Sequence, residues 1–230
     1  MNRLRTWIAV VPAMVLPFLA ALCYFVFFSE YFFARIIYGG TKVFTLVWPL
    51  LACWLILRTK FPPLELKAAR HLKAIPLGLL SGAAVALLAF LLMQTSLGTV
   101  VKASAGDIKA KADELGFLRH YWVFAIFLSF FHSLLEEYYW RWFVFGQLRK
   151  LLKPSAAHLL AAFCFAAHHI VVATQFFPVA WGVLLGSLVG VGGLLFSLLY
   201  ARQNTLAGAW LSHMIIDLAL MSIGHQLLFG

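Results

Sequence analysis

The sequence predicts an all-α protein, a polytopic bundle of about seven to eight transmembrane helices. Of its 230 residues, 63% are hydrophobic and only 11% are charged, which is too apolar for a soluble domain of this size. The apolar residues gather in stretches near the length of about 20 residues that crosses a hydrocarbon core. Seven such stretches lie at residues 6–28, 42–57, 74–97, 120–147, 156–174, 178–200 and 205–222.

The first three stretches each have features of a membrane span. The first follows two arginines, but it is too long for a signal peptide and has no small-residue cleavage site, so we expect it to remain as an anchor. Residues 58–76 contain three prolines and a basic stretch, which favour a short interfacial helix before the third span. Gly78 and Gly82 in the third span allow a neighbouring helix to come close.

The later stretches continue the same pattern. Before the fourth span, loosely spaced apolar residues in 99–119 predict a helix that lies on the outer surface of the membrane. Gly182, Gly186 and Gly190 recur every four residues in the sixth span, which predicts a tight helix contact and not a ligand loop. No repeat or domain boundary interrupts the chain, so we expect residues 1–230 to form a single membrane domain.

Positive charge gathers at the ends of the predicted spans. The basic residues near the N-terminus, in 58–73, in 149–153 and at Arg202 all fall on one side of a seven-span protein. The positive-inside rule therefore predicts a cytoplasmic N-terminus. The formal net charge of +10 does not require a nucleic acid as partner, because headgroups of the lipid bilayer account for these residues.

The most informative residues are polar ones inside the predicted spans. A charged group near the bilayer centre costs at least roughly 2.5–3.5 kcal/mol, so an ionisable cluster at that depth indicates a functional site. The cluster comprises His132, Glu136, Glu137 and Arg141 in the fourth span, His168 and His169 in the fifth, and His213 and Asp217 in the seventh. We expect these three helices to share one site.

Spacing within each helix predicts which of these side chains meet. His132 and Glu136, Glu137 and Arg141, and His213 and Asp217 are each four residues apart, so each pair shares a helix face.

Several roles stay open at this point. The Glu137 and Arg141 pair is explained equally well as a structural ion pair and as part of the chemistry. Glu136 lies about 100° around the helix, where the same arginine cannot serve it equally well, which makes it the candidate general base. His168 neighbours His169 and is expected to point elsewhere; it and His132 are candidates for supporting or purely structural roles.

The order of the motifs resembles a known family. Glu136 to Arg141 read Glu-Glu-x-x-x-Arg, residues 165–169 read Phe-x-x-x-His, and residues 213–217 read His-x-x-x-Asp. This set is similar to that of the CPBP family, which contains type II CAAX prenyl proteases and bacteriocin-processing (Abi) intramembrane proteases. The resemblance covers a protease-like core of about residues 120–220.

The resemblance implies roles for the motif residues. Glu136 would activate water, His169 would help to position or deprotonate that water, and Glu137 and Arg141 would support the site. His213 and Asp217 would stabilise the oxyanion, although the family often has asparagine at the position of Asp217. An ionised aspartate accepts hydrogen bonds but donates none, so Asp217 is a departure from the pattern.

Two mechanisms remain open. The resemblance favours a glutamate mechanism without a cofactor. A divalent metal such as zinc is the alternative, with Glu136, His169, His213 and Asp217 as the ligands, although these residues have no recognised local zinc spacing. His-Glu-x-x-His and Gly-x-Ser-x-Gly motifs are absent from the sequence, which disfavours zincin-type and serine-type hydrolysis.

The expected function is hydrolysis of a peptide bond in a membrane-anchored protein or peptide. A C-terminal sorting signal, a prenylated tail and a leader peptide are all compatible with the motifs. The chain's brevity and compact loops favour the bacterial inner membrane. Two other functions stay open: an inactive membrane protein with a binding or immunity role, and a proton-coupled transporter, which would also concentrate ionisable residues at the midplane.

Overall fold

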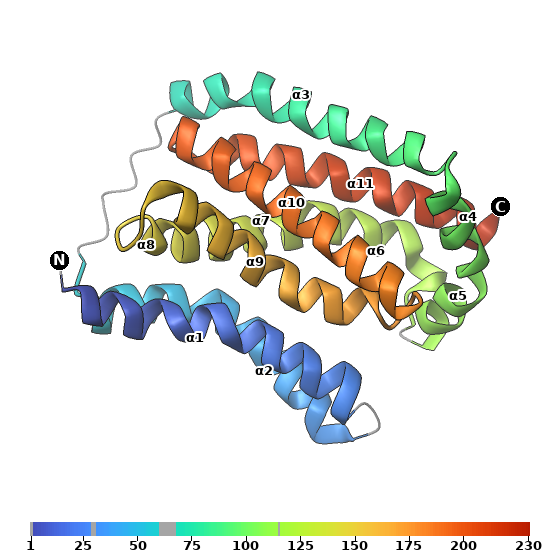
Figure 1. The fold of residues 1–230 in the computed structure, drawn as a ribbon, viewed down its shortest axis with the longest axis horizontal. Helices are drawn as coiled ribbons and strands as arrows, with labels where there is room; N and C mark the ends of the chain where they lie inside the picture. The colour runs from blue at the N-terminus through green and yellow to red at the C-terminus, as the bar shows by residue number, and fades with distance from the viewer. Residues whose placement is uncertain (1, 29–30, 60–67, 115) are drawn as a thin grey trace.

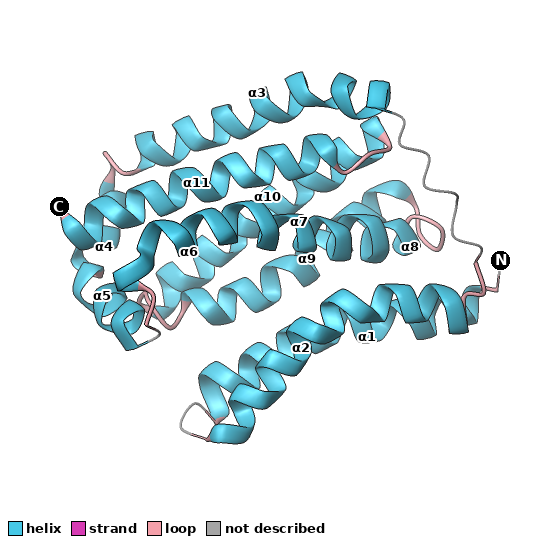
Figure 2. Ribbon diagram, turned by 180° about the vertical axis from the view of Figure 1, so that it is seen from behind, coloured by secondary structure: helices cyan, strands magenta, loops and turns pink. Residues whose placement is uncertain are grey.

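The computed structural model describes residues 2–28, 31–59, 68–114 and 116–230, and the described chain is a bundle of helices without strands (Figures 1 and 2). Seven of its helical stretches are long and apolar enough to cross a membrane, as the sequence predicted. They are Arg3–Phe27, Gly39–Ile56, Ala68–Leu92, Leu118–Leu148, Pro154–Ala173, Val179–Gln203 and Ala207–Phe229. The all-α polytopic fold is therefore confirmed.

The first half of the chain supplies three spans. Their helical segments are α1 (Arg3–Leu22) continued by the π-helical η1 (Cys23–Phe27), α2 (Phe32–Leu51) continued by the π-helical η2 (Ala52–Ile56), and α3 (Ala68–Leu92). The third span begins at Ala68 and not near residue 74, so the described part of the predicted interfacial helix is the first two turns of α3. The rest of that prediction, residues 60–67, lies outside the described residues.

The predicted surface helix over residues 99–119 is two helices. α4 (Ser96–Ala103) ends at Ser104, and α5 (Ala105–Glu114) begins directly after it. Ile108 of α5 packs against a small core formed by Tyr121, Ala125 and Leu228. The segment is therefore attached to the end of the bundle through an apolar contact.

The fourth span changes its helical type along its length. Its segments are η3 (Leu118–His120), α6 (Tyr121–Phe127), the π-helical η4 (Leu128–His132), α7 (Ser133–Glu136), the π-helical η5 (Glu137–Phe145) and α8 (Gly146–Leu148). π-Helical turns are rare and concentrate at functional sites. Here η4 precedes α7, which ends at Glu136, and η5 begins at Glu137. A regular helical period did not predict this change of helical type.

The last three spans are the regular helices α9 (Pro154–Ala173), α10 (Val179–Gln203) and α11 (Ala207–Phe229). α3 lies beside α11, and α9 lies between α10 and the α1–α2 hairpin (Figure 1). The two views place α10 and the α6–α7 segment on opposite faces of the bundle.

Glycine packing holds two pairs of helices together, as predicted. A Cβ atom at Gly186 would lie 2.5 Å from the Cα of Ile170 on α9, and one at Gly190 would lie 2.7 Å from the Cβ of Ala166. A Cβ atom at Gly78 would lie 2.8 Å from the Cα of Gly208 on α11. These backbones approach so closely because glycine has no side chain to separate them.

The α1–α2 hairpin is attached to the fourth span by polar contacts between side chains and backbone. Tyr139 Oη donates to the carbonyl of Ala13 at 2.8 Å, and Tyr138 Oη donates to the carbonyl of Leu46 at 3.2 Å. Tyr139 is also part of the main apolar core, which includes Val10 of α1. The hairpin therefore supports the helix that carries both glutamates.

Substitution of Gly186 by alanine tests the α9–α10 contact. We expect Gly186→Ala to destabilise the protein by about 1–3 kcal/mol, because the new methyl group meets helix backbone that cannot move alone. Gly192→Ala is the matched control on the same helix, since its Cβ would meet only the Phe196 ring at 3.8 Å. Thermal unfolding in detergent measures both, and equal stability of the two variants would contradict this packing.

Candidate active site

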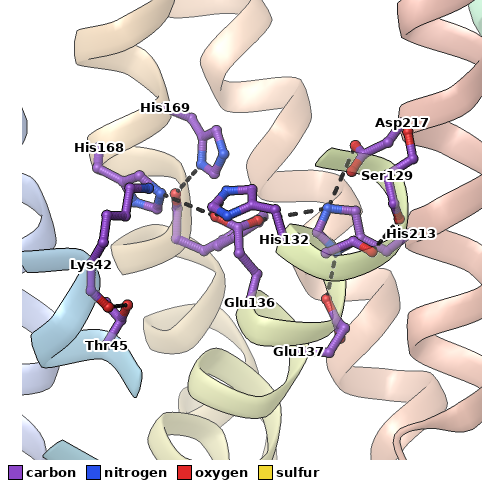
Figure 3. A network of polar contacts seen from close by, with 12 residues as sticks. Lys42, Thr45, Ser129, His132, Glu136, Glu137, His168, His169, His213 and Asp217 are labelled. Atoms are coloured by element: carbon purple, nitrogen blue, oxygen red, sulfur yellow. Dashed lines mark hydrogen bonds and ion pairs between the residues drawn. The ribbon is translucent and has the colours of Figure 1, made fainter. Parts of the chain in front are cut away.

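The structure brings the polar residues of three spans together (Figure 3). Glu136 ends α7, and Glu137 begins η5. The α9 histidines and the α11 pair of His213 and Asp217 point toward them. All three contacts expected from four-residue spacing are present: His132 to Glu136 at 3.4 Å, Glu137 to Arg141 at 3.1 Å, and His213 to Asp217 at 3.6 Å.

Glu137 is the fully buried member of the glutamate pair, with no exposed surface. Its Oε1 lies 3.1 Å from Nη1 of Arg141 and accepts a hydrogen bond from His213 Nδ1 at 2.8 Å. The Arg141 guanidinium lies over the rings of Phe165 and Phe196, at 4.3 and 4.9 Å from their centroids. Arg141 and His213 thus hold this carboxylate, and two aromatic faces in turn hold the Arg141 guanidinium.

His213 is fixed by that contact. Because Nδ1 faces Glu137, the other ring nitrogen is directed elsewhere: Nε2 lies 3.7 Å from Glu136 Oε2 and 3.6 Å from Asp217 Oδ1. The Phe196 ring stacks on the imidazole at 4.6 Å. A histidine held through one nitrogen presents the other to its surroundings in a defined direction.

Glu136 has a different environment, although it is the adjacent residue. Its carboxylate retains 12% of its side-chain exposure, and three imidazoles surround it. Oε1 lies 3.4 Å from His132 Nε2 and 3.9 Å from His168 Nε2, and Oε2 faces His213. Arg141 forms its ion pair with Glu137, as the rotation between adjacent helix positions predicts.

We expected His168 to point away from the site, because it neighbours His169. That prediction is wrong: His168 faces the site. Its ring stacks on Trp140 at 5.5 Å and its Nε2 faces Glu136, while its centroid lies 4.1 Å from that of His169. The reason is that His169 turns back along α9, where its Nδ1 donates to the carbonyl of Phe165 at 2.8 Å. The two rings therefore reach the same side of the helix.

One group of side chains in the described part of the chain has the donor types and separations of a metal site. A carboxylate oxygen of Glu136 and one ring nitrogen each of His168 and His169 all lie within 4.8 Å of one another. The sequence had suggested His213 and Asp217 as further ligands, but this group does not include them. His213 contacts Glu136, and Asp217 contacts His213. The donors that gather around Glu136 thus include His168.

Sequence reasoning missed three residues around the site. Trp140 supports the His168 ring, and Phe196 covers both His213 and Arg141. Ser129 Oγ is buried and has no hydrogen-bond partner among the described residues. The spacing offered one usable signal for Ser129, since it lies seven residues before Glu136 and so shares its helix face.

Residues 118–219 match the family model described as Type II CAAX prenyl endopeptidase Rce1-like. The family resemblance seen in the motifs is thereby confirmed over this segment, which contains every motif residue from His132 to Asp217. Neither the comparison with curated proteins nor that with solved structures finds a match. The first three spans lie outside the matched segment.

Removal of the Arg141 guanidinium tests the buried pair. We expect Arg141→Ala to destabilise the protein by about 3–5 kcal/mol, because it leaves the Glu137 carboxylate buried without its cation. Arg149→Ala removes a nearby exposed arginine and serves as the control. Thermal unfolding of both variants is the measurement, and a wild-type melting temperature for Arg141→Ala would exclude a stabilising pair.

Proposed function

We propose that this protein is an intramembrane endopeptidase in which Glu136 activates the hydrolytic water. One observation carries the proposal: of two adjacent glutamates, Glu137 is fully buried and paired with Arg141, whereas Glu136 keeps partial exposure among imidazoles. A general base must reach the proton that it removes, which requires an accessible carboxylate. Family membership of the surrounding segment supports hydrolysis of a peptide bond.

The surroundings of Glu136 fit the activation of water. His169 uses Nδ1 for the Phe165 carbonyl, which leaves Nε2 for a water molecule or the substrate. In this proposal Glu136 takes a proton from water as the oxygen attacks the scissile carbonyl. The same proton then passes to the amine nitrogen as the peptide bond breaks, so that Glu136 is ionised again at the end.

His213 and Asp217 are placed to act on the oxyanion. The Nε2 atom of His213 faces Glu136 and Asp217, and it becomes a donor to a developing negative charge when it carries a proton in addition to Nδ1. The Asp217 carboxylate would orient that ring, whereas a protonated Asp217 would itself donate. Fixed donors of this kind act strongly where water is excluded.

A metal-assisted reaction is the second candidate, and the cluster of Glu136, His168 and His169 favours it. These are ligand types that zinc accepts, and three protein ligands are typical of a catalytic zinc site. A bound divalent ion would supply Lewis-acid activation of water. We place the metal-free reaction first, because these ligands lack a recognised local zinc spacing.

The proposed substrate is a membrane-anchored protein or peptide that reaches the site within the bilayer. A C-terminal sorting signal or a leader peptide fits a bacterial inner membrane, and a prenylated tail fits the description of the matching family. The basic residues at the ends of the spans favour a cytoplasmic N-terminus.

The first test replaces the base and keeps its size. We expect Glu136→Gln to abolish cleavage of membrane-anchored test peptides without loss of thermal stability, while Asp113→Asn, an exposed carboxylate on α5, keeps wild-type turnover. Each reaction is run with and without a chelator. Wild-type turnover that persists in the chelator supports the glutamate mechanism. Turnover that is lost in the chelator and returns with an added divalent ion supports the metal-assisted mechanism.

Normal turnover by Glu136→Gln would exclude Glu136 as the base under either mechanism.

Substitution of Asp217 separates its two possible roles. If Asp217 donates to the oxyanion, we expect Asp217→Asn to keep or raise kcat, because an amide always has a donor, and Asp217→Ala to lower it. If an ionised Asp217 orients His213, Asp217→Asn and Asp217→Ala lower kcat alike. The kcat values of the three proteins on one peptide decide between these roles.

A further inference from the structure

A small polar cavity lies far from the proposed active site, at the end of the bundle that holds the N-terminus. Its volume is about 100 Å³, and its polar lining comprises Asn2, Arg5, Thr6, Thr59, Gln147 and Lys150. Three segments meet here: the start of α1, the residues after η2 and the end of α8. The cavity therefore joins the α1–α2 hairpin to the fourth span.

The cavity is built from positioned donors. Gln147 is 6% exposed, and its Oε1 accepts a hydrogen bond from Lys150 Nζ at 3.0 Å. The amide nitrogen of Gln147 is therefore the end that remains as a donor. Asn2 is anchored in the same way, since its Oδ1 accepts from Arg5 N at 3.3 Å and leaves its own amide nitrogen as a donor.

The lining of the cavity contains two cationic side chains, Arg5 and Lys150. No carboxylate in the described ranges forms an ion pair with Arg5 or Lys150. Partial burial lowers the pKa of the Lys150 ammonium below its ordinary value; Cys53 opposes this shift and the neighbouring Arg149 adds to it. An anion at this position would offset the cost of keeping these cations together.

The size and depth of the cavity restrict its ligand. About 100 Å³ is more than the roughly 30 Å³ of a water molecule and well below the roughly 300–1,000 Å³ of pockets for drug-sized molecules, so it suits one small anionic group. The spans that border it begin at Arg3 and end at Ile56 and Leu148. The cavity thus lies where a bilayer has its phosphate groups.

We propose that this cavity binds the phosphate group of an anionic phospholipid, which fastens the α1–α2 hairpin to the fourth span. Figure 1 shows why such a contact matters: the hairpin lies near α8 and α9 at this end and diverges from the bundle toward its other end. A bound headgroup would connect Arg5 of the hairpin with Lys150 beyond α8. The site is independent of the chemistry at Glu136.

Thermal unfolding of the full chain in neutral detergent tests this proposal. We expect phosphatidylglycerol to raise the apparent melting temperature of the wild type, and phosphatidylcholine to leave it unchanged, because only the former carries net negative charge. Arg5→Gln and Lys150→Gln should each lose most of this increase, measured against their own lipid-free values. Arg202→Gln, an exposed arginine outside the cavity, should keep it.

Inorganic phosphate, with ionic strength matched by sodium chloride, distinguishes the two sources of the anion. If inorganic phosphate raises the melting temperature, and this increase depends on Arg5 and Lys150, the anion site is retained but its ligand is free phosphate and not the lipid. The proposal would be overturned if phosphatidylglycerol raised the melting temperature of Arg5→Gln and Lys150→Gln as much as that of the wild type. It would also be overturned if phosphatidylcholine gave the same increase as phosphatidylglycerol.

Discussion

The arrangement of the site depends on the buried carboxylate of Glu137. Its Oε1 contacts both Arg141 on its own helix and His213 on α11, and the aromatic rings over Arg141 come from α9 and α10. One charged group thus connects four spans. Because a carboxylate without partners is very costly inside a protein or a bilayer, these helices cannot separate without a large loss of stability. This constraint fixes the direction of His213 Nε2 and, with it, the position available to a reacting group.

Adjacent glutamates can have different roles, one structural and one chemical, because consecutive residues of a helix point about 100° apart. Glu137 faces the interior between α9, α10 and α11, whereas Glu136 faces His132 and His168 and remains partly accessible. The π-helical segment η4 ends at His132, before α7, and the π-helical segment η5 begins at Glu137, so the helical type changes between the two glutamates.

The part of the chain outside the matched family segment supports the site from two sides. α3 packs closely on α11 through Gly78 and Gly208, and the hairpin contacts η5 through Tyr138 and Tyr139. The proposed phosphate cavity joins the same hairpin to the end of the fourth span, at Gln147 and Lys150. The helices that carry the motifs are therefore held in position by helices that carry none.

The sequence by itself determined the spans and the candidate residues, because apolar length and buried charge are local properties of the chain. It also predicted the contacts within each helix, such as Glu137 with Arg141, since four-residue spacing places side chains on one face. Only the tertiary structure decided which histidines of the other spans face Glu136. His168 was expected to point away, and it faces the carboxylate because His169 bonds to its own helix and Trp140 supports the His168 ring. Such contacts depend on side-chain rotation and on neighbouring helices, which linear spacing does not record.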